Sequence, residues 1–388
     1  MPAQPDRATA SMVLALHASP VLGSFVVTGA GSRFLSWLFS EGGSSATVLD
    51  AQIPYAQNAL NDYVGQAPEQ NVSESTAVAM AEEAYWKALR LDALAHPESI
   101  GDREIIGVAC TATIATNRLK RGEHRAHIAV RSSFGTSASA IWLEKGVRDR
   151  SGEEEIVSRA LLNAITSTAG IPDMLPLELS ASERYEEFHQ VAENPLTNVS
   201  SGDVPFVLID GDGEITTSIS ESIAVVAGSF NPSHEGHREM SEVAGRSTGK
   251  RAAFELSVTN VDKPQLSAAH LDARIAQMRR ETPILITRAP TFEEKARLVP
   301  GTTFVIGFDT AVRVVDAKYY SGTVEAALDV IREASCDFLV AGRLSDGSFR
   351  SLDELKLPPG YELLFDVMSE EEFRFDGSST DLRARSSS

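Results

Sequence analysis

The chain alternates short apolar runs with longer amphipathic stretches, and it does so in two separate regions. The first region spans residues 20–169, with expected strands at 23–27 and 105–110 and expected helices at 75–95 and 153–168. The second begins at Ile223, with expected strands at 223–227, 252–257, 284–287, 304–307 and 338–341 and expected helices at 266–280, 292–298 and 324–335. Strands that alternate with helices predict a mostly parallel sheet covered by helices. Both regions are therefore expected to be α/β.

The stretch between these regions is irregular and rich in proline, and it sets the expected domain boundaries. Residues 206–210 and 214–218 can form a hairpin around the turn at 211–213. We expect a flexible terminus at 1–20, an α/β domain at 21–170, a linker with this hairpin at 171–221 and a second α/β domain at 222–388.

Charge and cysteine content narrow the possible partners. The 388 residues carry 54 acidic and 35 basic side chains, for a formal net charge of −19. Such a surface disfavours nucleic acid and anionic membranes, whereas a local pocket can still bind an anionic small molecule. The two cysteines, Cys110 and Cys336, form no disulfide framework. With no run of 18 apolar residues and no secretory pattern, the chain is expected to be cytoplasmic.

The expected strand 223–227 is followed directly by a glycine-led segment with two histidines, Gly228-Ser-Phe-Asn-Pro-Ser-His-Glu-Gly-His237. A loop of this kind can place backbone N–H groups near phosphate, and the helix that follows adds positive potential. His234 and His237 are three positions apart, so a first helical turn points both the same way. Gly236 leaves room for a nucleotide. The alternative interpretation is that His234 and His237 are simply two surface or core histidines that follow a turn.

This segment resembles the HxGH signature of the nucleotidylyltransferase superfamily in its G-[ST]-F-[DN]-P-x-H-x-G-H form. The resemblance implies a Rossmann-like, doubly wound parallel sheet for the C-terminal domain. It also implies that His234 and His237 stabilise charge on the α-phosphate during nucleotidyl transfer. The implied nucleotide-binding residues in this segment are Gly228, Ser229, Phe230, Asn231 and Gly236.

A second motif closes the chain, Ser378-Ser379-Thr380-Asp-Leu-Arg383. It is either a capped terminal helix or a phosphate site, because hydroxyls and an N-terminal turn can bind phosphate and Arg383 adds a multidentate donor. The segment is similar to the ISSTxIR motif of the same family, which implies contacts with the β- and γ-phosphates. Gly377 departs from the apolar residue usual there.

A Gly–x–Asp turn follows the expected strand at 304–307. Asp309 after Gly307 either binds the nucleotide ribose, as the resemblance implies, or caps the next helix. No carboxylate cluster marks a metal site, and the resemblance implies Mg²⁺ that is carried on the triphosphate.

The combined motifs look most like nicotinamide and nicotinate mononucleotide adenylyltransferases, which implies ATP and a phosphorylated pyridine nucleotide as substrates. Those enzymes often hold the ring on a tryptophan after the Gly–x–Asp turn, where this chain has Tyr319 and Tyr320. CTP or another phosphorylated acceptor, and a non-catalytic nucleotide-binding regulator, remain alternatives. A homo-oligomer is possible under each of them.

The N-terminal domain resembles the CinA C-terminal family, which includes nicotinamide mononucleotide deamidases. The similarity rests on Gly43-Ser44-Ser45, Tyr55 and Glu74–Glu82. A serine nucleophile needs a base, and Leu60 stands where the family usually has a lysine. We therefore expect deamidase activity to be lost. The N-terminal domain would then bind a pyridine nucleotide, hold a dimer together or support the C-terminal domain.

Overall fold

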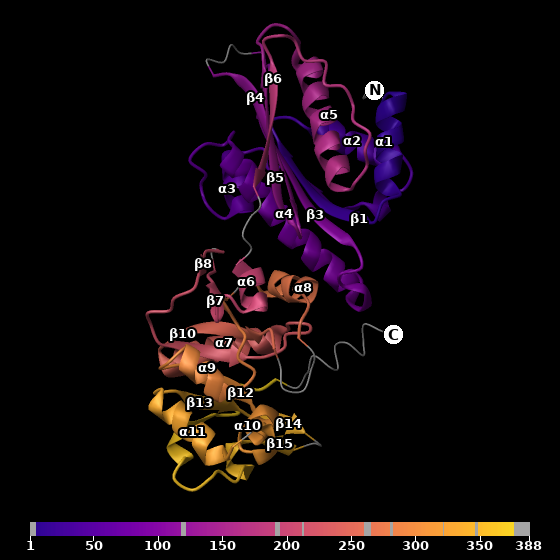
Figure 1. Ribbon diagram of the computed structural model, residues 1–388. Helices are drawn as coiled ribbons and strands as arrows, with labels where there is room; N and C mark the ends of the chain where they lie inside the picture. Colours follow the sequence, from indigo (N-terminus) through magenta and orange to yellow (C-terminus); the bar gives the residue numbers. More distant parts are fainter. Residues whose placement is uncertain are drawn as a thin grey trace. The chain divides into compact units, whose positions relative to one another are not determined.

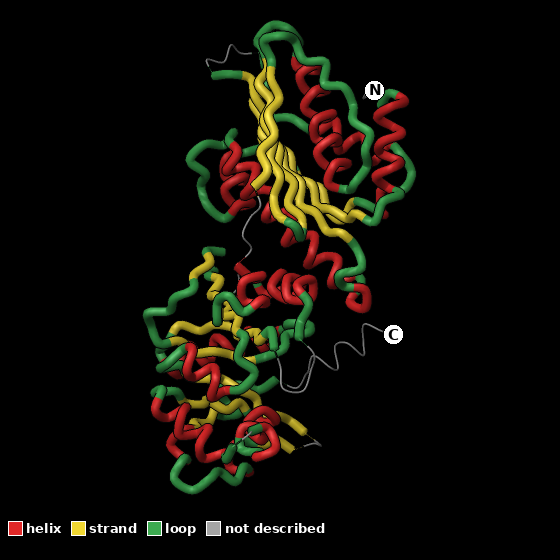
Figure 2. The backbone as a smooth tube through the Cα atoms, viewed as in Figure 1, coloured by secondary structure: helices red, strands yellow, loops and turns green. Residues whose placement is uncertain are grey.

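The computed structural model describes residues 5–117, 122–190, 195–211, 213–259, 265–279, 282–320, 322–345 and 348–375 (Figures 1 and 2). The chain divides into two compact units, Met1–Glu193 and Asn194–Ser388. Within the described ranges, no helix is both long and apolar enough to cross a membrane. Both units are α/β, as expected from the strand–helix alternation.

Unit 1 is built on a six-stranded sheet in the order β2-β1-β3-β4-β5-β6. Strands β1 and β2 and strands β1 and β3 are parallel, and β3 to β6 form an antiparallel meander. The strands are β1 Val21–Thr28, β2 Val48–Gln52, β3 Glu104–Thr113, β4 His124–Ser132, β5 Gly135–Leu143 and β6 Arg184–Gln190.

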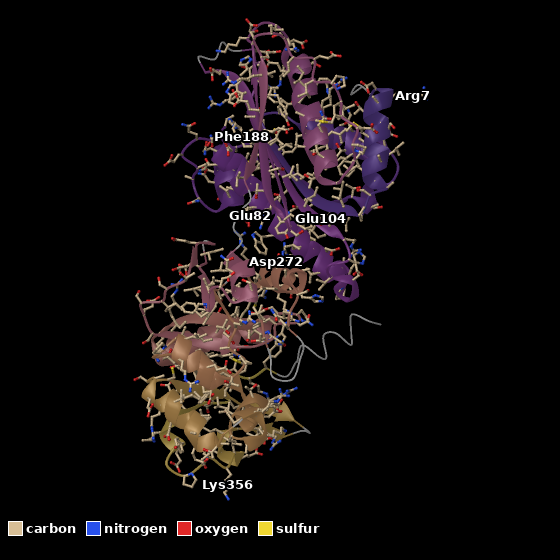
Figure 3. The ribbon with its side chains drawn as sticks, viewed as in Figure 1. Arg7, Glu82, Glu104, Phe188, Asp272 and Lys356 are labelled. Atoms are coloured by element: carbon tan, nitrogen blue, oxygen red, sulfur yellow. The ribbon has the colours of Figure 1, made fainter. Side chains whose placement is uncertain are left out.

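Helices cover both faces of this sheet (Figure 1). Alternate residues of a strand point to opposite faces, so Phe25 packs against the helices of one face and Val26 against those of the other. The first face carries α1 Arg7–His17, α2 Ser32–Ser40 and α5 Arg150–Thr168, and the second carries α3 Gln57–Val64 and α4 Glu74–Ala95. An ion pair between Glu82 of α4 and Arg131 of β4, 3.0 Å apart, adds to the packing on the second face (Figure 3).

Helix α1 lies within the range expected to be a flexible terminus. Asp6 caps it by accepting the Thr9 N–H at 2.8 Å, and Met12, Val13 and Leu16 are buried in the core of unit 1. A short apolar stretch near the start of a chain gives little sequence signal, because its burial depends on distant helices such as α5.

Unit 2 contains an eight-stranded sheet in the order β16-β13-β12-β9-β10-β11-β7-β8. The six strands from β16 to β11 are parallel, whereas β7 and β8 pair antiparallel at one edge. The parallel strands are β9 Ile223–Ala227, β10 Arg251–Ser257, β11 Ile284–Thr287, β12 Thr303–Gly307, β13 Asp337–Ala341 and β16 Phe365–Met368. This is the doubly wound arrangement expected from the sequence.

The direction of winding reverses between β9 and β12, and the helices divide between the two faces accordingly. Helix α7 Glu235–Thr248 packs on one face, and the opposite face carries α9 Phe292–Leu298, α10 Phe308–Val314 and α11 Val324–Glu333. In open α/β sheets, ligands bind at the carboxyl ends of the strands where the winding reverses. A ligand-binding site is therefore expected at the carboxyl ends of β9 and β12.

Residues 171–221, expected as a linker with a hairpin, contribute strands to both units. Strand β6 completes the first sheet. Strands β7 Phe206–Ile209 and β8 Ile215–Thr216 form the hairpin at the edge of the second sheet, preceded by α6 Pro195–Ser201. The division between the units thus lies at residues 193 and 194, inside the expected linker.

Candidate active site

The loop after β9, residues 228–234, is held by the strand and helix beside it. The Gly228 N–H donates to the Glu255 carbonyl at 3.1 Å, and Arg274 of α8 (Ala268–Met278) donates to the Ser229 carbonyl at 3.0 Å. Phe230 is buried at 1% exposure and packs on Phe254 with ring centroids 5.0 Å apart. Its backbone adopts φ +43°. These contacts fix the loop at the carboxyl end of the central strand.

The two histidines of the loop stack on one another at the start of α7. Their ring centroids lie 3.7 Å apart with 23° between the planes, and His234 is the N-cap of the helix. The His234 N–H donates to Nδ1 of His237 at 3.2 Å. A neutral imidazole that accepts at Nδ1 carries its proton on Nε2, so His237 presents an N–H donor there.

Burial keeps this pair uncharged. It lowers the pKa of His237 to about 3, with His234 as a second cause, and it also lowers the pKa of His234, with a contribution from Arg238. Neutral imidazoles can still donate hydrogen bonds to phosphate oxygens, and they need lose no proton to do so.

We expect His237 to make the protein sensitive to acid. The unfolded chain takes up a proton near pH 6.5 whereas the folded chain resists it down to about pH 3. Stability therefore falls as the pH drops through this window, with a slope of about 1.4 kcal/mol per pH unit. Urea unfolding of the wild type and of His237→Asn between pH 7 and pH 4 measures the effect. Equal slopes for the two proteins would contradict it.

Phe375 covers the histidine motif. Its ring stacks on His234 with centroids 4.9 Å apart and 8° between the planes. A Cβ atom on Gly236 would lie only 2.4–2.9 Å from the Phe375 ring, so only glycine fits under it. The predicted second motif, Ser378, Ser379, Thr380 and Arg383, lies outside the described residues, which end at Phe375.

The Gly–x–Asp turn lies at the carboxyl end of β12, the neighbour of β9. Gly307, not Asp309, is the N-cap of α10, and Asp309 occupies the first turn. Asp309 is exposed and forms an ion pair with Arg343 of the short hairpin β14 (Arg343–Ser345) and β15 (Ser348–Arg350). Asp309 is therefore not the cap of α10. It forms a carboxylate–guanidinium pair at the carboxyl ends of the parallel strands, where the histidines also lie.

A cavity of 630 Å³ opens beside the loop, at the carboxyl ends of β9, β10 and β11. Gly228 and Ser229 line it, together with Tyr319 and Tyr320, the two aromatics expected near the acceptor. The Tyr320 hydroxyl donates to the Val314 carbonyl at 2.8 Å, and burial raises its pKa to about 12. The lining residues with ionisable side chains that the sequence reasoning missed are Glu255, His270, Arg274, Lys295 and Arg313.

One sequence signal could have identified part of this lining. Glu255 is the single charged residue in the run 252–258, where the other residues except Ser257 are apolar, and a charge in a buried strand needs a partner. That partner is Lys295 of α9, at 2.7 Å. Among the described residues, no group of three His, Cys, Asp or Glu side chains could hold a metal. Mg²⁺ carried by the triphosphate stays a prediction.

The CinA-like residues of unit 1 lie at opposite ends of the sheet. Ser44 and Ser45 precede β2, and the Ser44 hydroxyl donates to the Leu38 carbonyl at 2.7 Å. Tyr55 follows β2 and is 71% exposed. A strand of five residues separates them, about 17 Å at the usual rise. Leu60, where a lysine would stand, is buried in the core.

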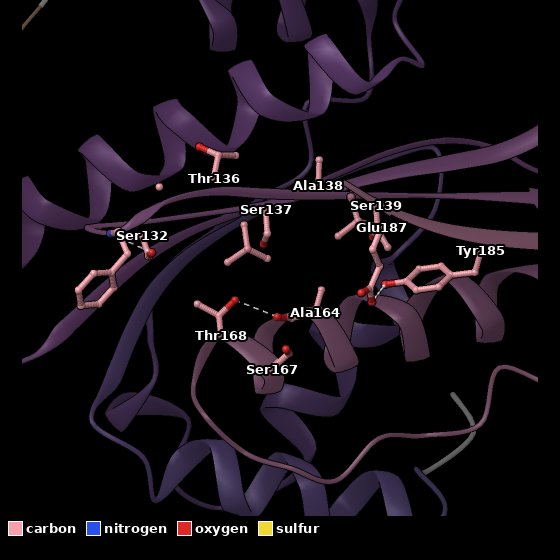
Figure 4. A pocket seen from close by; sticks show the side chains of 14 residues that line it. Ser132, Thr136, Ser137, Ala138, Ser139, Ala164, Ser167, Thr168, Tyr185 and Glu187 are labelled. Atoms are coloured by element: carbon pink, nitrogen blue, oxygen red, sulfur yellow. Dashed lines mark hydrogen bonds between the residues drawn. The ribbon is translucent and has the colours of Figure 1, made fainter. Parts of the chain in front are cut away.

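Unit 1 also contains a groove of 360 Å³ between β4–β6 and the end of α5 (Figure 4). Hydroxyl side chains dominate its polar lining: Ser132, Thr136, Ser137, Ser139, Ser167, Thr168 and Tyr185. The Tyr185 hydroxyl donates to Glu187 at 3.0 Å. None of the CinA-like residues lines this groove.

Comparison with known proteins gives a partial match. No protein-family model matches the chain. A curated Schizosaccharomyces pombe protein named "Putative nicotinamide mononucleotide adenylyltransferase" is 28% identical in an alignment of 156 residues that covers 34% of this chain. The match spans 60% of the length of that relative.

Two solved structures match part of the chain at low identity. The competence/damage inducible protein CihA from Agrobacterium tumefaciens is 19% identical, with a TM-score of 0.33, and the similarity covers 43% of this chain and 98% of that one. A competence-damaged protein (CinA) superfamily protein from Enterobacter cloacae is 14% identical, with a TM-score of 0.31, over 43% of this chain and 95% of its own.

Proposed function

We propose that the chain is a nucleotidyltransferase that moves the adenylyl group of ATP to nicotinamide or nicotinate mononucleotide and releases pyrophosphate. The observation that carries this proposal is the stacked pair of neutral histidines, His234 and His237, on the loop after the central strand. The pair lies where the winding of the sheet reverses, on the loop whose first residues, Gly228 and Ser229, line a cavity large enough for a mononucleotide. The name of the Schizosaccharomyces pombe relative supports the same reaction.

The proposed reaction is a direct in-line displacement. A phosphate oxygen of the acceptor attacks the α-phosphorus of ATP, the new O–P bond forms, and the bond from the α-phosphorus to the bridging oxygen breaks. The electron pair of that bond leaves with pyrophosphate, whose charge the Mg²⁺ carried by the triphosphate offsets when bound. No covalent enzyme intermediate is needed.

The chain's own groups position the nucleotide and stabilise charge. The Nε2–H of His237 and the N-terminal turn of α7 face the α-phosphate, where negative charge grows in the transition state. Asp309 is proposed to bind the ribose, and Ser378, Ser379, Thr380 and Arg383 the β- and γ-phosphates. A nucleotide that lies against Gly236 displaces the ring of Phe375 from it.

The direct test is pyrophosphate release by the full chain with Mg²⁺. ATP and CTP are each combined with nicotinamide mononucleotide, nicotinate mononucleotide or no acceptor. We expect turnover with ATP and at least one mononucleotide, and none without acceptor. Turnover with CTP but not with ATP would mean that CTP is the nucleotide substrate in place of ATP. Binding of ATP without pyrophosphate release in any combination would leave a non-catalytic nucleotide-binding protein.

Unit 1 is proposed to support the transferase without being a deamidase. The Ser44 hydroxyl donates to the Leu38 carbonyl, and the buried Leu60 stands where the family usually has the lysine that would activate a serine nucleophile. In the same reactions, we expect no ammonia release from nicotinamide mononucleotide.

A further inference from the structure

A buried ion pair forms part of the cavity wall next to the histidine loop. Glu255 and Lys295 are 1% and 6% exposed, and Lys295 Nζ lies 2.7 Å from Oε2 of Glu255. The Thr287 hydroxyl donates to the other carboxylate oxygen at 2.6 Å. Both charged side chains line the same cavity as Gly228 and Ser229.

This pair is charge-balanced and keeps hydrogen-bonding capacity. Each oxygen of Glu255 accepts one bond and has a second lone pair, and the Lys295 ammonium has three donors and gives one of them to Glu255. Removing two charges from water is unfavourable, and a well-packed apolar pair is often at least as stable. Stability alone therefore gives a weak reason for a pair at this position, and its place in the cavity wall points to a ligand.

The two donors that remain on Lys295 suit an uncharged oxygen better than a second carboxylate. An amide oxygen accepts a hydrogen bond and leaves the pair balanced. A ligand carboxylate brings a second negative charge beside Glu255, and one buried ammonium cannot neutralise both. Phe292 and Tyr320 also line the cavity, which suits a flat pyridine ring, and Lys295 Nζ lies over the Phe292 ring at 5.0 Å from its centroid.

We propose that Glu255 and Lys295 select the amide form of the acceptor, nicotinamide mononucleotide, over its acid form, nicotinate mononucleotide. This inference rests on the proposed function for the identity of the acceptor. Arg274 is near the loop end of the cavity, where it donates to the Ser229 carbonyl, and it is suited to the acceptor's phosphate. Arg274 would then bind the phosphate of the acceptor, and Lys295 would bind the amide group on its ring.

The test measures binding and turnover separately. Calorimetry gives the affinity of the full chain for each mononucleotide, and pyrophosphate release with ATP gives kcat/KM for each. The wild type is expected to favour the amide by roughly tenfold or more in both measurements. In Glu255→Gln, Lys295 is free to pair with a substrate carboxylate, so we expect the preference to fall by at least about tenfold.

Two further variants keep the result interpretable. Glu183→Gln removes the same charge from a buried ion pair in unit 1, with Arg148, and is expected to leave the preference unchanged. Glu255→Gln combined with Lys295→Met leaves no buried charge behind if the single variant fails to fold, and it should bind both mononucleotides within about threefold of each other.

The outcomes separate this inference from the proposed function. Discrimination in binding without any pyrophosphate release would overturn the transferase and leave the inference standing. A wild type that favours the acid, or a preference unmoved in both cavity variants, would overturn the inference while the transferase stands. Binding of neither mononucleotide would overturn both.

Discussion

His237→Ala is expected to lower the rate of pyrophosphate release by about a thousandfold, because it removes one preorganised donor from the site of growing charge. The loss should fall on kcat rather than on KM, since the hydrogen bond that this N–H donates to the α-phosphate strengthens in the transition state. Initial rates with saturating ATP and nicotinamide mononucleotide measure it.

Two conservative variants separate the role of His237 in the fold from its role in the reaction. Asparagine can replace Nδ1, which accepts the His234 N–H, whereas glutamine can place a donor where Nε2 lies. We expect His237→Asn to fold well and be nearly inactive, and His237→Gln to recover part of the rate. His96→Ala, at an exposed histidine of unit 1, serves as the control. Full turnover in a well-folded His237→Ala would rule out the proposed role.

The second large effect concerns stability and does not depend on the function. Gly107 lies in β3 directly under α4, and a Cβ there would lie 2.1 Å from the Ala81 carbonyl oxygen and 2.2 Å from the Tyr85 nitrogen. Backbone atoms of a packed helix cannot move aside as a side-chain tip can. Gly107→Ala is therefore expected to destabilise unit 1 by about 3 kcal/mol.

Gly245→Ala in α7 is the matched control for that change. A Cβ on Gly245 would make only ordinary contacts, at 3.7 Å from Ala252, and alanine is favoured over glycine within a helix by about 0.5–1 kcal/mol. Urea unfolding of the full chain compares both variants with the wild type. A Gly107→Ala protein as stable as Gly245→Ala would show that α4 does not pack on β3 as described.

The sequence was most informative where structure is decided locally. The strand 223–227, the turn after it and the helix that starts beyond His234 depend on neighbouring residues, and the structure has each of them as expected. Asp309 shows the limit of the same reasoning. Its place after a strand was predictable, but its partner Arg343 comes from a hairpin 34 residues later in the chain.

Features decided by distant packing could not be predicted in this way. Helix α1 depends on the core of unit 1, and Lys295 meets Glu255 across 40 residues of sequence. Spacing along the chain does not determine such pairings, because each needs the sheet to be assembled first.

The hairpin of β7 and β8 has a practical consequence for anyone who wishes to isolate unit 2. A chain truncated to begin at residue 222 would lack both strands, and β11, still paired with β10, would have no partner along Ile284–Thr287 on the side that β7 covers. A bare apolar edge is a template for pairing with other molecules, so such a fragment should self-associate. A start at residue 195 retains the protective strands and should yield a monodisperse preparation.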